Sequence, residues 1–530
     1  MENKQKKILK KVEKLRGIKN QWNGFLEEIY KYSMPNRNTS SDYTQGHKRD
    51  NHIFDSTAVV ATNGFVSRIQ TLMVKPWAKW FLFEAGQDIP ESERKDINKD
   101  LEKIANIVYE EINYSNFAEQ ISSSFFDLAA STGVIMVRED ARSHAQSSLV
   151  FEAIPLSDVM LEPASDGDIK TVFRDIKIPA GQVQHKWKQA NLTSDLKDLA
   201  KNNPDEMVEL VEGVVYNEDK GNYNFILLEK SADEKEFLID TSIDESPYIV
   251  FREYVTPGET YGRGRLMNVL GDIKSANKIM EYSLSAAAMS IAGVYTAVND
   301  GIFNVNTARF APGAVIPVSS NGQNPTIAPL SNPSDINVTQ FELAELRRNI
   351  NNILLSMPLG NIEDVKGRSA TEMSLRQNDF LQQSAAGFNR LQTELLNKIV
   401  VKVVYTLKKL GKIDPIEING KEVKAKFKSP VSAIQGNEEL QKMQQFLELM
   451  RLMPESVSNM LISYEKIPQD ILDHLDLPEK YVRSEVEFKK IAQQQALLMQ
   501  QQMGQPQPPQ GNILAGLSIF NYEQGSYPIS

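Results

Sequence analysis

The hydrophobic periodicity of this 530-residue chain changes near residue 256. Before it, over residues 133–255, apolar side chains occur in short segments between polar, Pro and Gly turns, which is typical of β-strands. After it, apolar side chains recur at helical spacing over long stretches, which is typical of amphipathic helices. The sequence therefore predicts an α+β fold that is mainly helical, and its length favours about three or four domain-sized units.

Three helical segments are expected before the strands, over residues 3–32, 51–78 and 91–131, with a strand near the aromatic sequence that follows Pro76. The first is Lys-rich: eight cations between Lys4 and Lys19 are opposed only by Glu2 and Glu13. Two interpretations of this basic helix stay open, a solvated helix face and a surface that contacts acidic partners or DNA.

In the second half, two long helices bracket a small β module. The helices are expected over residues 263–292 and 335–357, and the Val-, Gly-, Asn- and Pro-rich sequence between them reads as a compact β insertion. After a break, the capping box Ser369-Ala-Thr-Glu372 starts a very long helix that reaches Gly411. Short strands, further helices and a Gln- and Pro-rich tail complete the predicted order.

The chemistry of most enzyme classes is missing. The chain has no cysteine, five histidines, no P-loop sequence and no His-Glu-x-x-His, which excludes thiolate catalysis and Cys-ligated zinc and disfavours nucleotide hydrolysis. The sequence Gly262-Arg-Gly-Arg265 resembles the start of a phosphate loop, but it follows no clear parallel strand and lacks the third glycine, so we interpret it as a turn leading into a helix. No catalytic residue, cofactor or metal site is predicted.

The net charge of −10 and a pI near 5.3 disfavour tight nucleic-acid binding, because phosphate is bound by Lys and Arg. An acidic chain remains compatible with a protein surface that makes only weak contacts with DNA and lets it slide past. The N-terminal segment lacks the apolar region of a secretory signal, and no segment is apolar enough to predict a transmembrane helix.

The order of these parts resembles the podovirus portal proteins, the bacteriophage head-to-tail connector family, over about residues 1–500. Several local sequences are similar as well: Ile53-Phe-Asp-Ser-Thr-Ala58, Trp80-Phe-Leu-Phe83, Tyr261-Gly-Arg-Gly264 leading to Asp272-Ile-Lys, Arg368-Ser-Ala-Thr-Glu-Met373 with Arg376, and Ser429-Pro-Val431 with Gln435. Each is short, so the resemblance depends on their order and spacing.

The resemblance implies a homo-oligomeric ring, typically a dodecamer, at one capsid vertex. The parts it implies are a wing (1–262), two stem helices (263–292 and 335–357), a clip (293–334), a tunnel loop (358–368), a long wing helix with short strands (369–433), a crown (434–503) and a flexible tail (504–530).

The implied function is a channel for packaging and ejecting double-stranded DNA without sequence specificity, in the virion and, during assembly, the host cytoplasm. Implied partners are the major capsid protein, the terminase large subunit and tail adaptor or nozzle proteins, with no membrane. Candidate channel residues are Asn361, Lys366 and Arg368 on the tunnel loop and Lys274, Lys278, Arg347 and Arg348 on the stem. A salt bridge near the helix start is an equal alternative for Arg368.

Two other functions stay open. The first is another virion structural protein, a scaffold or tail adaptor, against which the β insertion between long helices argues. The second is a metal-dependent enzyme acting on nucleic acid, which would require a carboxylate cluster assembled by folding.

Overall fold

The computed structural model describes residues 4–37, 50–75, 79–86, 89, 91–139, 146–230, 237–292, 295–297, 327–329, 336–356, 386–414, 423–427 and 442–449. The chain divides into two compact units, Met1–Ile434 and Gln435–Ser530. In the second unit the described part is a helix over residues 442–449, in the region where further helices are expected after the short strands. All further elements belong to the first unit.

Antiparallel strands fill the region where alternating apolar segments predict them. The larger sheet has five strands in the order β4 (Val159–Pro163), β5 (Ile169–Pro179), β6 (Met207–Asn217), β7 (Asn222–Glu229) and β8 (Ile239–Ile243). The smaller sheet has three in the order β3 (Leu149–Ala153), β2 (Thr132–Glu139) and β9 (Tyr248–Arg252). A short helical turn (η1, Leu156–Asp158) precedes β4.

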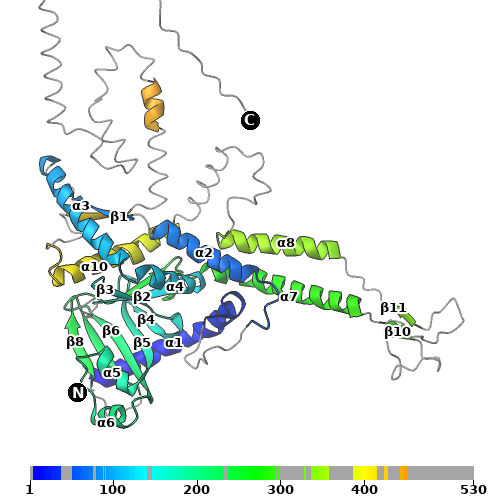
Figure 1. The fold of residues 1–530 in the computed structure, drawn as a ribbon, viewed down its shortest axis with the longest axis horizontal. Coiled ribbons are helices and arrows are strands. Elements are labelled where there is room, and N and C mark those ends of the chain that lie inside the picture. The colour runs from blue at the N-terminus through cyan, green and yellow to red at the C-terminus, as the bar shows by residue number, and fades with distance from the viewer. Residues whose placement is uncertain are drawn as a thin grey trace, which may run out of the picture. The chain divides into compact units, whose positions relative to one another are not determined.

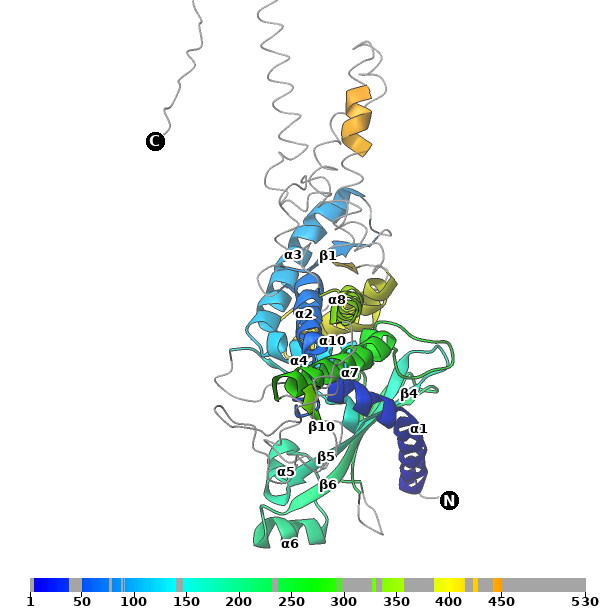
Figure 2. The same cartoon turned by 90° about the vertical axis from the view of Figure 1, so that its right-hand side faces the viewer.

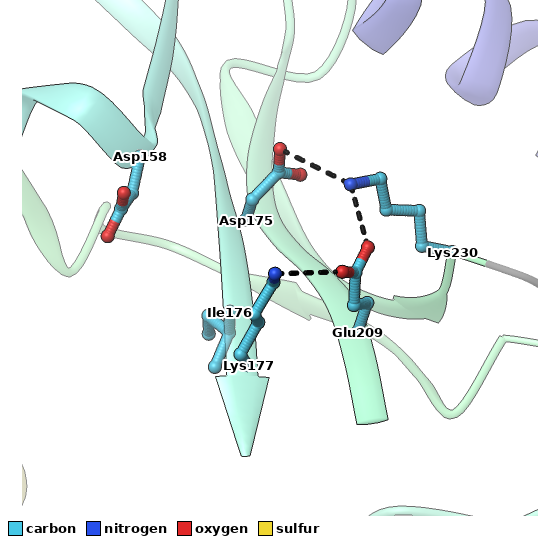
Figure 3. Close-up of a pocket in the computed structure, with 6 residues that line it drawn as sticks. All are labelled: Asp158, Asp175, Ile176, Lys177, Glu209 and Lys230. Carbon is cyan, nitrogen blue, oxygen red and sulfur yellow. Dashed lines mark ion pairs between the residues drawn. The ribbon is translucent and has the colours of Figure 1, made fainter. Parts of the chain in front are cut away.

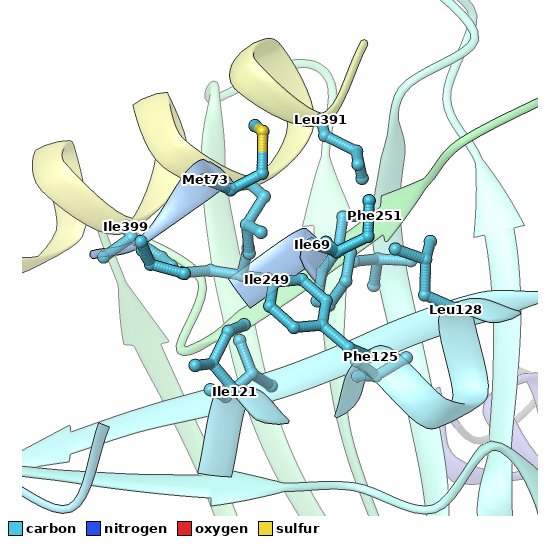
Figure 4. Close-up of a cluster of buried hydrophobic side chains, with 14 of the residues drawn as sticks. Ile69, Met73, Ile121, Phe125, Leu128, Ile249, Phe251, Leu391 and Ile399 are labelled. Atoms are coloured by element: carbon cyan, nitrogen blue, oxygen red, sulfur yellow. The ribbon is translucent and has the colours of Figure 1, made fainter. Parts of the chain in front are cut away.

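The main core lies where helices pack on the three-stranded sheet. It is built from α2 (Thr57–Met73), α4 (Phe117–Ala130), β9 and the helical segment that ends in α10 (Lys398–Lys409). Figure 4 shows Ile69 of α2, Phe125 of α4, Phe251 of β9 and Ile399 of α10 pointing into one cluster, and all four are fully buried. Burying each such side chain contributes roughly 1.5–3 kcal/mol, so this cluster joins segments more than 300 residues apart.

A two-stranded sheet forms a second long-range connection. In it β1 (Phe81–Ala85) pairs antiparallel with β12 (Val423–Phe427), and α3 (Glu91–Asn113) packs beside β1. Trp80 stacks on Phe427 at a ring separation of 6.3 Å. The aromatic strand after Pro76 and the strand before residue 433 are thus confirmed, and they are partners.

The N-terminal helix and the two long helices of the second half are also confirmed. The N-terminal helix is α1 (Lys4–Ser33), and the long pair is α7 (Arg265–Ala292) and α8 (Ile336–Ile353). Figure 1 shows α7 and α8 running side by side in opposite directions, with β10 (Tyr295–Ala297) and β11 (Ile327–Pro329) at the end remote from the sheets. The rest of the β insertion and the loop at 358–368 lie outside the described residues.

Two features differ from the sequence prediction. Helices α5 (Ala180–Lys186) and α6 (Ser194–Asn202) interrupt the region read as strands, and together they cover one small apolar cluster of the larger sheet. In the very long helix, whose start lies outside the described residues, a π-helical turn (η3, Gln392–Asn397) precedes α10. The π turn directs Glu394 into the core, where its carboxylate accepts hydrogen bonds from the Arg252 side chain at 2.8 and 3.2 Å.

Candidate functional site: the helix pair α7 and α8

The base of the α7–α8 pair is fixed by a buried ion pair. Arg265, the first residue of α7, donates to the Glu253 carboxylate from Nε at 2.8 Å and from Nη2 at 2.5 Å. Its Nη1 donates to the backbone oxygen of Ile353 at 3.1 Å, where α8 ends. One guanidinium therefore ties the start of α7 to the end of α8, and a planar fork with several donors suits such a junction.

The turn before α7 packs against the body of the protein. The Gly262 amide donates to Thr132 Oγ1 at 2.8 Å, and the Ser131 hydroxyl donates to the Gly262 oxygen at 2.7 Å. A Cβ on Gly264 would lie 2.3 Å from the backbone oxygen of Ala129. The Gly262 amide is already bonded to the protein, which supports the interpretation of this sequence as a packed turn rather than a phosphate loop.

A second junction lies near the middle of α7. Asn277 Oδ1 accepts from the backbone amides of Phe54 and Asp55 at 2.7 and 3.1 Å, and its Nδ2 donates to the His52 oxygen at 3.0 Å. The Asp55 carboxylate accepts from Arg347 Nε of α8 at 2.9 Å. Residues 52–55 therefore join α7 to α8.

Asp55 is charged in this junction. Burial alone would raise the pKa of its carboxyl group, but hydrogen bonds from Thr57 and Arg347 outweigh burial and lower that pKa. Its side chain is 4% exposed, whereas that of Arg347 is 40% exposed. The buried carboxylate therefore depends on Arg347 for its charge partner.

Three of the seven candidate channel residues make ion pairs within the chain. Lys274 pairs with Glu28 of α1 at 3.2 Å, Lys278 pairs with Glu281 one helical turn on, and Arg347 pairs with Asp55. Arg348 is exposed, and no ion pair joins it to another residue in the described ranges. Asn361, Lys366 and Arg368 lie outside the described residues.

The outer half of the helix pair is exposed on nearly all sides wherever the structure describes its side chains. In α7, residues 282–285 and 287–288 are exposed, and in α8, residues 340–342 and 344–345 are exposed. Three large apolar side chains stand among them: Tyr282 is 63% exposed, Leu284 51% and Phe341 75%. A single copy of the chain leaves this apolar surface in water.

The junction residues were not predicted as functional, although the sequence held a signal. Asp55 lies in Ile53-Phe-Asp-Ser-Thr-Ala58, and the packed turn lies in Tyr261-Gly-Arg-Gly264, two of the sequences that carry the family resemblance. Both sequences form the base of the helix pair. Their role is structural: they set the direction in which α7 and α8 leave the sheets.

A second candidate site within the described residues is a cavity on the five-stranded sheet, and its chemistry does not indicate a ligand. A small cavity of about 190 Å³ on the five-stranded sheet is lined by Asp158, Asp175, Lys177, Glu209 and Lys230 (Figure 3). Its lysines pair with its carboxylates, Lys230 with Glu209 at 2.9 Å and Lys177 with Glu209 at 3.2 Å. Asp175 lies 4.0 Å from Lys230, and Asp158 accepts a hydrogen bond from the Ser157 hydroxyl at 2.8 Å, so each charged side chain of the cavity already has a partner in the protein and the cavity gives no argument for a ligand.

Metal clusters and membrane-spanning helices do not occur within the described ranges. No group of three or more His, Asp or Glu side chains there is arranged to hold a metal ion. No helix there is long and apolar enough to cross a membrane.

Two of the solved structures that resemble this chain come from gene transfer agent particles. A chain in the neck of an empty gene transfer agent particle is 12% identical with a TM-score of 0.35, over 80% of this chain and 95% of that one. A chain in the virion of a native gene transfer agent particle has the same identity and TM-score, over 83% of this chain and 96% of that one. No curated protein matches the sequence.

A family model described as bacteriophage head to tail connecting protein matches residues 5–482. This covers nearly the whole chain, including the helix pair, its base and the segments on either side. A protein that connects head to tail is a structural part of the virion, as the resemblance predicts. The chain therefore belongs to the bacteriophage head to tail connecting protein family, and its place is at the junction of capsid and tail.

Proposed function

We propose that this connector is the portal protein, a closed ring of about twelve copies around a channel for double-stranded DNA. The observation that carries the proposal is the family match over residues 5–482, which takes in the helix pair and nearly all of the chain around it. In this proposal the ring sits at one capsid vertex, where DNA enters during packaging and leaves during ejection.

The exposed outer half of the helix pair supports assembly. The outer halves of the two helices bury too little apolar surface to be stable by themselves. In a ring, the neighbouring copies cover Tyr282, Leu284 and Phe341, and the helix pairs together form the stem around the channel. The rigid base at Arg265 and Asn277 holds each pair at the angle that closure requires.

Charge in the channel is multiplied by the ring. One exposed cation per chain becomes a belt of positive charge, which centres a polyanion without reading its bases. In the part of the chain that the structure describes, the candidates are Lys274, Lys278, Arg347 and Arg348. On the tunnel loop the candidates are Asn361, Lys366 and Arg368. Because the chain is acidic overall, such contacts are weak and screened by salt, which permits sliding.

The remaining parts of the proposal concern partners. The clip, residues 293–334, docks the terminase large subunit during packaging and tail adaptor or nozzle proteins afterwards. The wing, residues 1–262 and 369–433, contacts the major capsid protein, and the crown, residues 434–503, lies on the capsid side.

Charge reversal in the tunnel loop tests the channel. We expect Lys366→Glu with Arg368→Glu to leave rings intact by mass and negative-stain imaging, while particles contain less DNA. The matched control is Lys197→Glu with Lys201→Glu, which reverses two exposed charges on α6. Unchanged DNA content in the loop variant would remove Lys366 and Arg368 from the channel, and a wild-type protein that forms no ring even with capsid protein would overturn the portal proposal.

A further inference from the structure

Helix α1 is held rigidly on the five-stranded sheet. Its apolar side chains Ile8, Val12 and Leu15 pack on Met160, Phe173, Val211, Ile226 and Leu228 of that sheet. Three cations of α1 also pair with acidic residues of the sheet strands: Lys4 with Asp240 at 2.6 Å, Lys11 with Glu162 at 2.5 Å and Arg16 with Asp175 at 2.8 Å. The underside of the helix is thereby fixed by both burial and charge.

The opposite side of α1 carries a ridge of cations that those acids do not reach. Lys6, Lys7 and Lys14 are exposed, and no ion pair joins them to another residue that the structure describes. At 100° per residue these positions, with the exposed Lys10 between them, fall within one 100° arc of the helix surface. We call Lys6, Lys7 and Lys14 the basic ridge.

The surroundings of the basic ridge are open. Figure 2 shows the N-terminal half of α1 on the outside of the sheet, with no other element of the described chain on its far side. One acid, the exposed Glu13, lies beside the ridge on the same helix. The chain carries a net charge of −10, so the ridge is a local patch of the opposite sign.

The dimensions of the ridge match a phosphate backbone. Lys6 and Lys14 are eight residues apart, which at 1.5 Å per residue is about 12 Å along the helix axis. One strand of duplex DNA has a phosphate about every 3.4 Å along its axis, so the ridge spans roughly three to four phosphates. Because α1 is docked, the helix that carries these lysines is already formed and positioned before any partner arrives, so only the lysine side chains lose freedom on binding.

We propose that the basic ridge of α1 is a second DNA-contact surface, separate from the channel, that binds the phosphate backbone of duplex DNA without reading sequence. Lysine suits this role because a mobile point charge interacts with phosphate in many geometries. The inference rests on the proposed function only in so far as that function brings DNA to the protein.

The experiment measures binding of a short labelled DNA duplex to the purified full-length protein at several salt concentrations. We expect Lys6→Glu, Lys7→Glu and Lys14→Glu together to weaken binding at least tenfold. The slope of log K against log salt should become shallower by about 0.9 for each phosphate that the variant no longer binds. The variant with Lys6→Arg, Lys7→Arg and Lys14→Arg should bind as the wild type does.

The matched control reverses the same number of exposed charges elsewhere on the sheet domain: Lys197→Glu, Lys201→Glu and Lys220→Glu, none of which has an ion pair in the described part of the chain. This control should retain wild-type DNA affinity. Equal weakening in both triple variants, or wild-type affinity in the ridge variant, would overturn the proposal. Wild-type DNA affinity combined with weaker binding to capsid protein would assign the ridge to an acidic protein surface instead.

Ring formation is scored separately by mass and imaging, so the two proposals fail independently. If the wild type forms rings and the ridge variant binds DNA normally, the proposal for the basic ridge is wrong and the portal proposal stands. If the protein forms no ring but the ridge variant loses DNA affinity, the portal proposal is wrong and the proposal for the basic ridge stands.

Discussion

Lys19 of α1 is buried, and its amine has no hydrogen-bond partner within the described structure. It lies over the ring of Tyr261 at 4.8 Å, just before the turn that leads into α7. Burial lowers the pKa of Lys19 to about 7, although the carboxylates of Asp127 and Asp158 act in the opposite direction. A residue at the contact between α1 and the body is therefore close to its titration point at neutral pH.

We expect Lys19→Met to stabilise the protein. The folded-state pKa lies below the ordinary value of 10.5, so the destabilisation by Lys19 is complete below about pH 7 and disappears as pH rises toward 10.5. The variant should raise the free energy of unfolding by roughly 2–4 kcal/mol near pH 6.5 and by less near pH 9.5. Urea unfolding at both pH values measures this, with Lys14→Met as the exposed control; a gain that does not change with pH would show that the amine is not the cause.

The ion pairs between side chains were the part of the site that the sequence predicted least well. Arg347 was predicted to face DNA, yet it pairs with Asp55, 292 residues earlier in the chain, and Lys274 pairs with Glu28, 246 residues earlier. Periodicity identifies the exposed side of a helix, but it does not identify which distant carboxylate folds against that side. Whether these residues also meet DNA stays a prediction.

At the level of elements, amphipathic periodicity was a reliable guide for long helices. It predicted α1, α7 and α8 because each has an apolar stripe that packs on the body. It failed for α5 and α6, which are seven and nine residues long and too short for a repeat to be recognised. It also missed the π turn at 392–397, because one extra residue per turn barely alters the spacing of apolar side chains.

Two glycines of the α7 region should respond oppositely to alanine. A Cβ at Gly264 would meet the backbone of Ala129 and Ala130, which cannot move aside. Apart from the nearby backbone of α7 itself, no described residue lies within 4 Å of a Cβ at Gly271. We expect Gly264→Ala to lower the free energy of unfolding by at least about 2 kcal/mol. Gly271→Ala should raise it by roughly 0.5–1 kcal/mol, because alanine favours the helix.

Chemical unfolding at equal protein concentration, followed by circular dichroism, compares these two variants, since assembly would otherwise shift the apparent stability. A tolerated Gly264→Ala would mean that the start of α7 is not packed against the end of α4 as closely as described. The direction of the helix pair would then depend on the contacts of Arg265 and Asn277 alone, which weakens the case for closure into a ring.

For the whole molecule, the exposed outer half of the helix pair bears on whether the chain assembles with other copies. Phe341 is 75% exposed on α8, so its replacement by Asp disturbs little within a single chain, and Phe341→Asp should still fold, with a melting temperature that falls only by the stabilisation that ring assembly gives the wild type. In a ring the same change places a charge in a water-excluded interface, which costs several kcal/mol per interface unless the charge is paired.

We therefore expect Phe341→Asp to shift the mass distribution from rings to single chains, whereas Tyr114→Asp, at a side chain that is 61% exposed just beyond α3, should leave rings intact. Mass determination of both variants beside the wild type distinguishes the outcomes. Rings that persist in Phe341→Asp would show that α8 is not covered by a neighbouring copy. The exposed apolar residues of the pair would then require another partner, for which tail adaptor proteins and the terminase large subunit are the candidates.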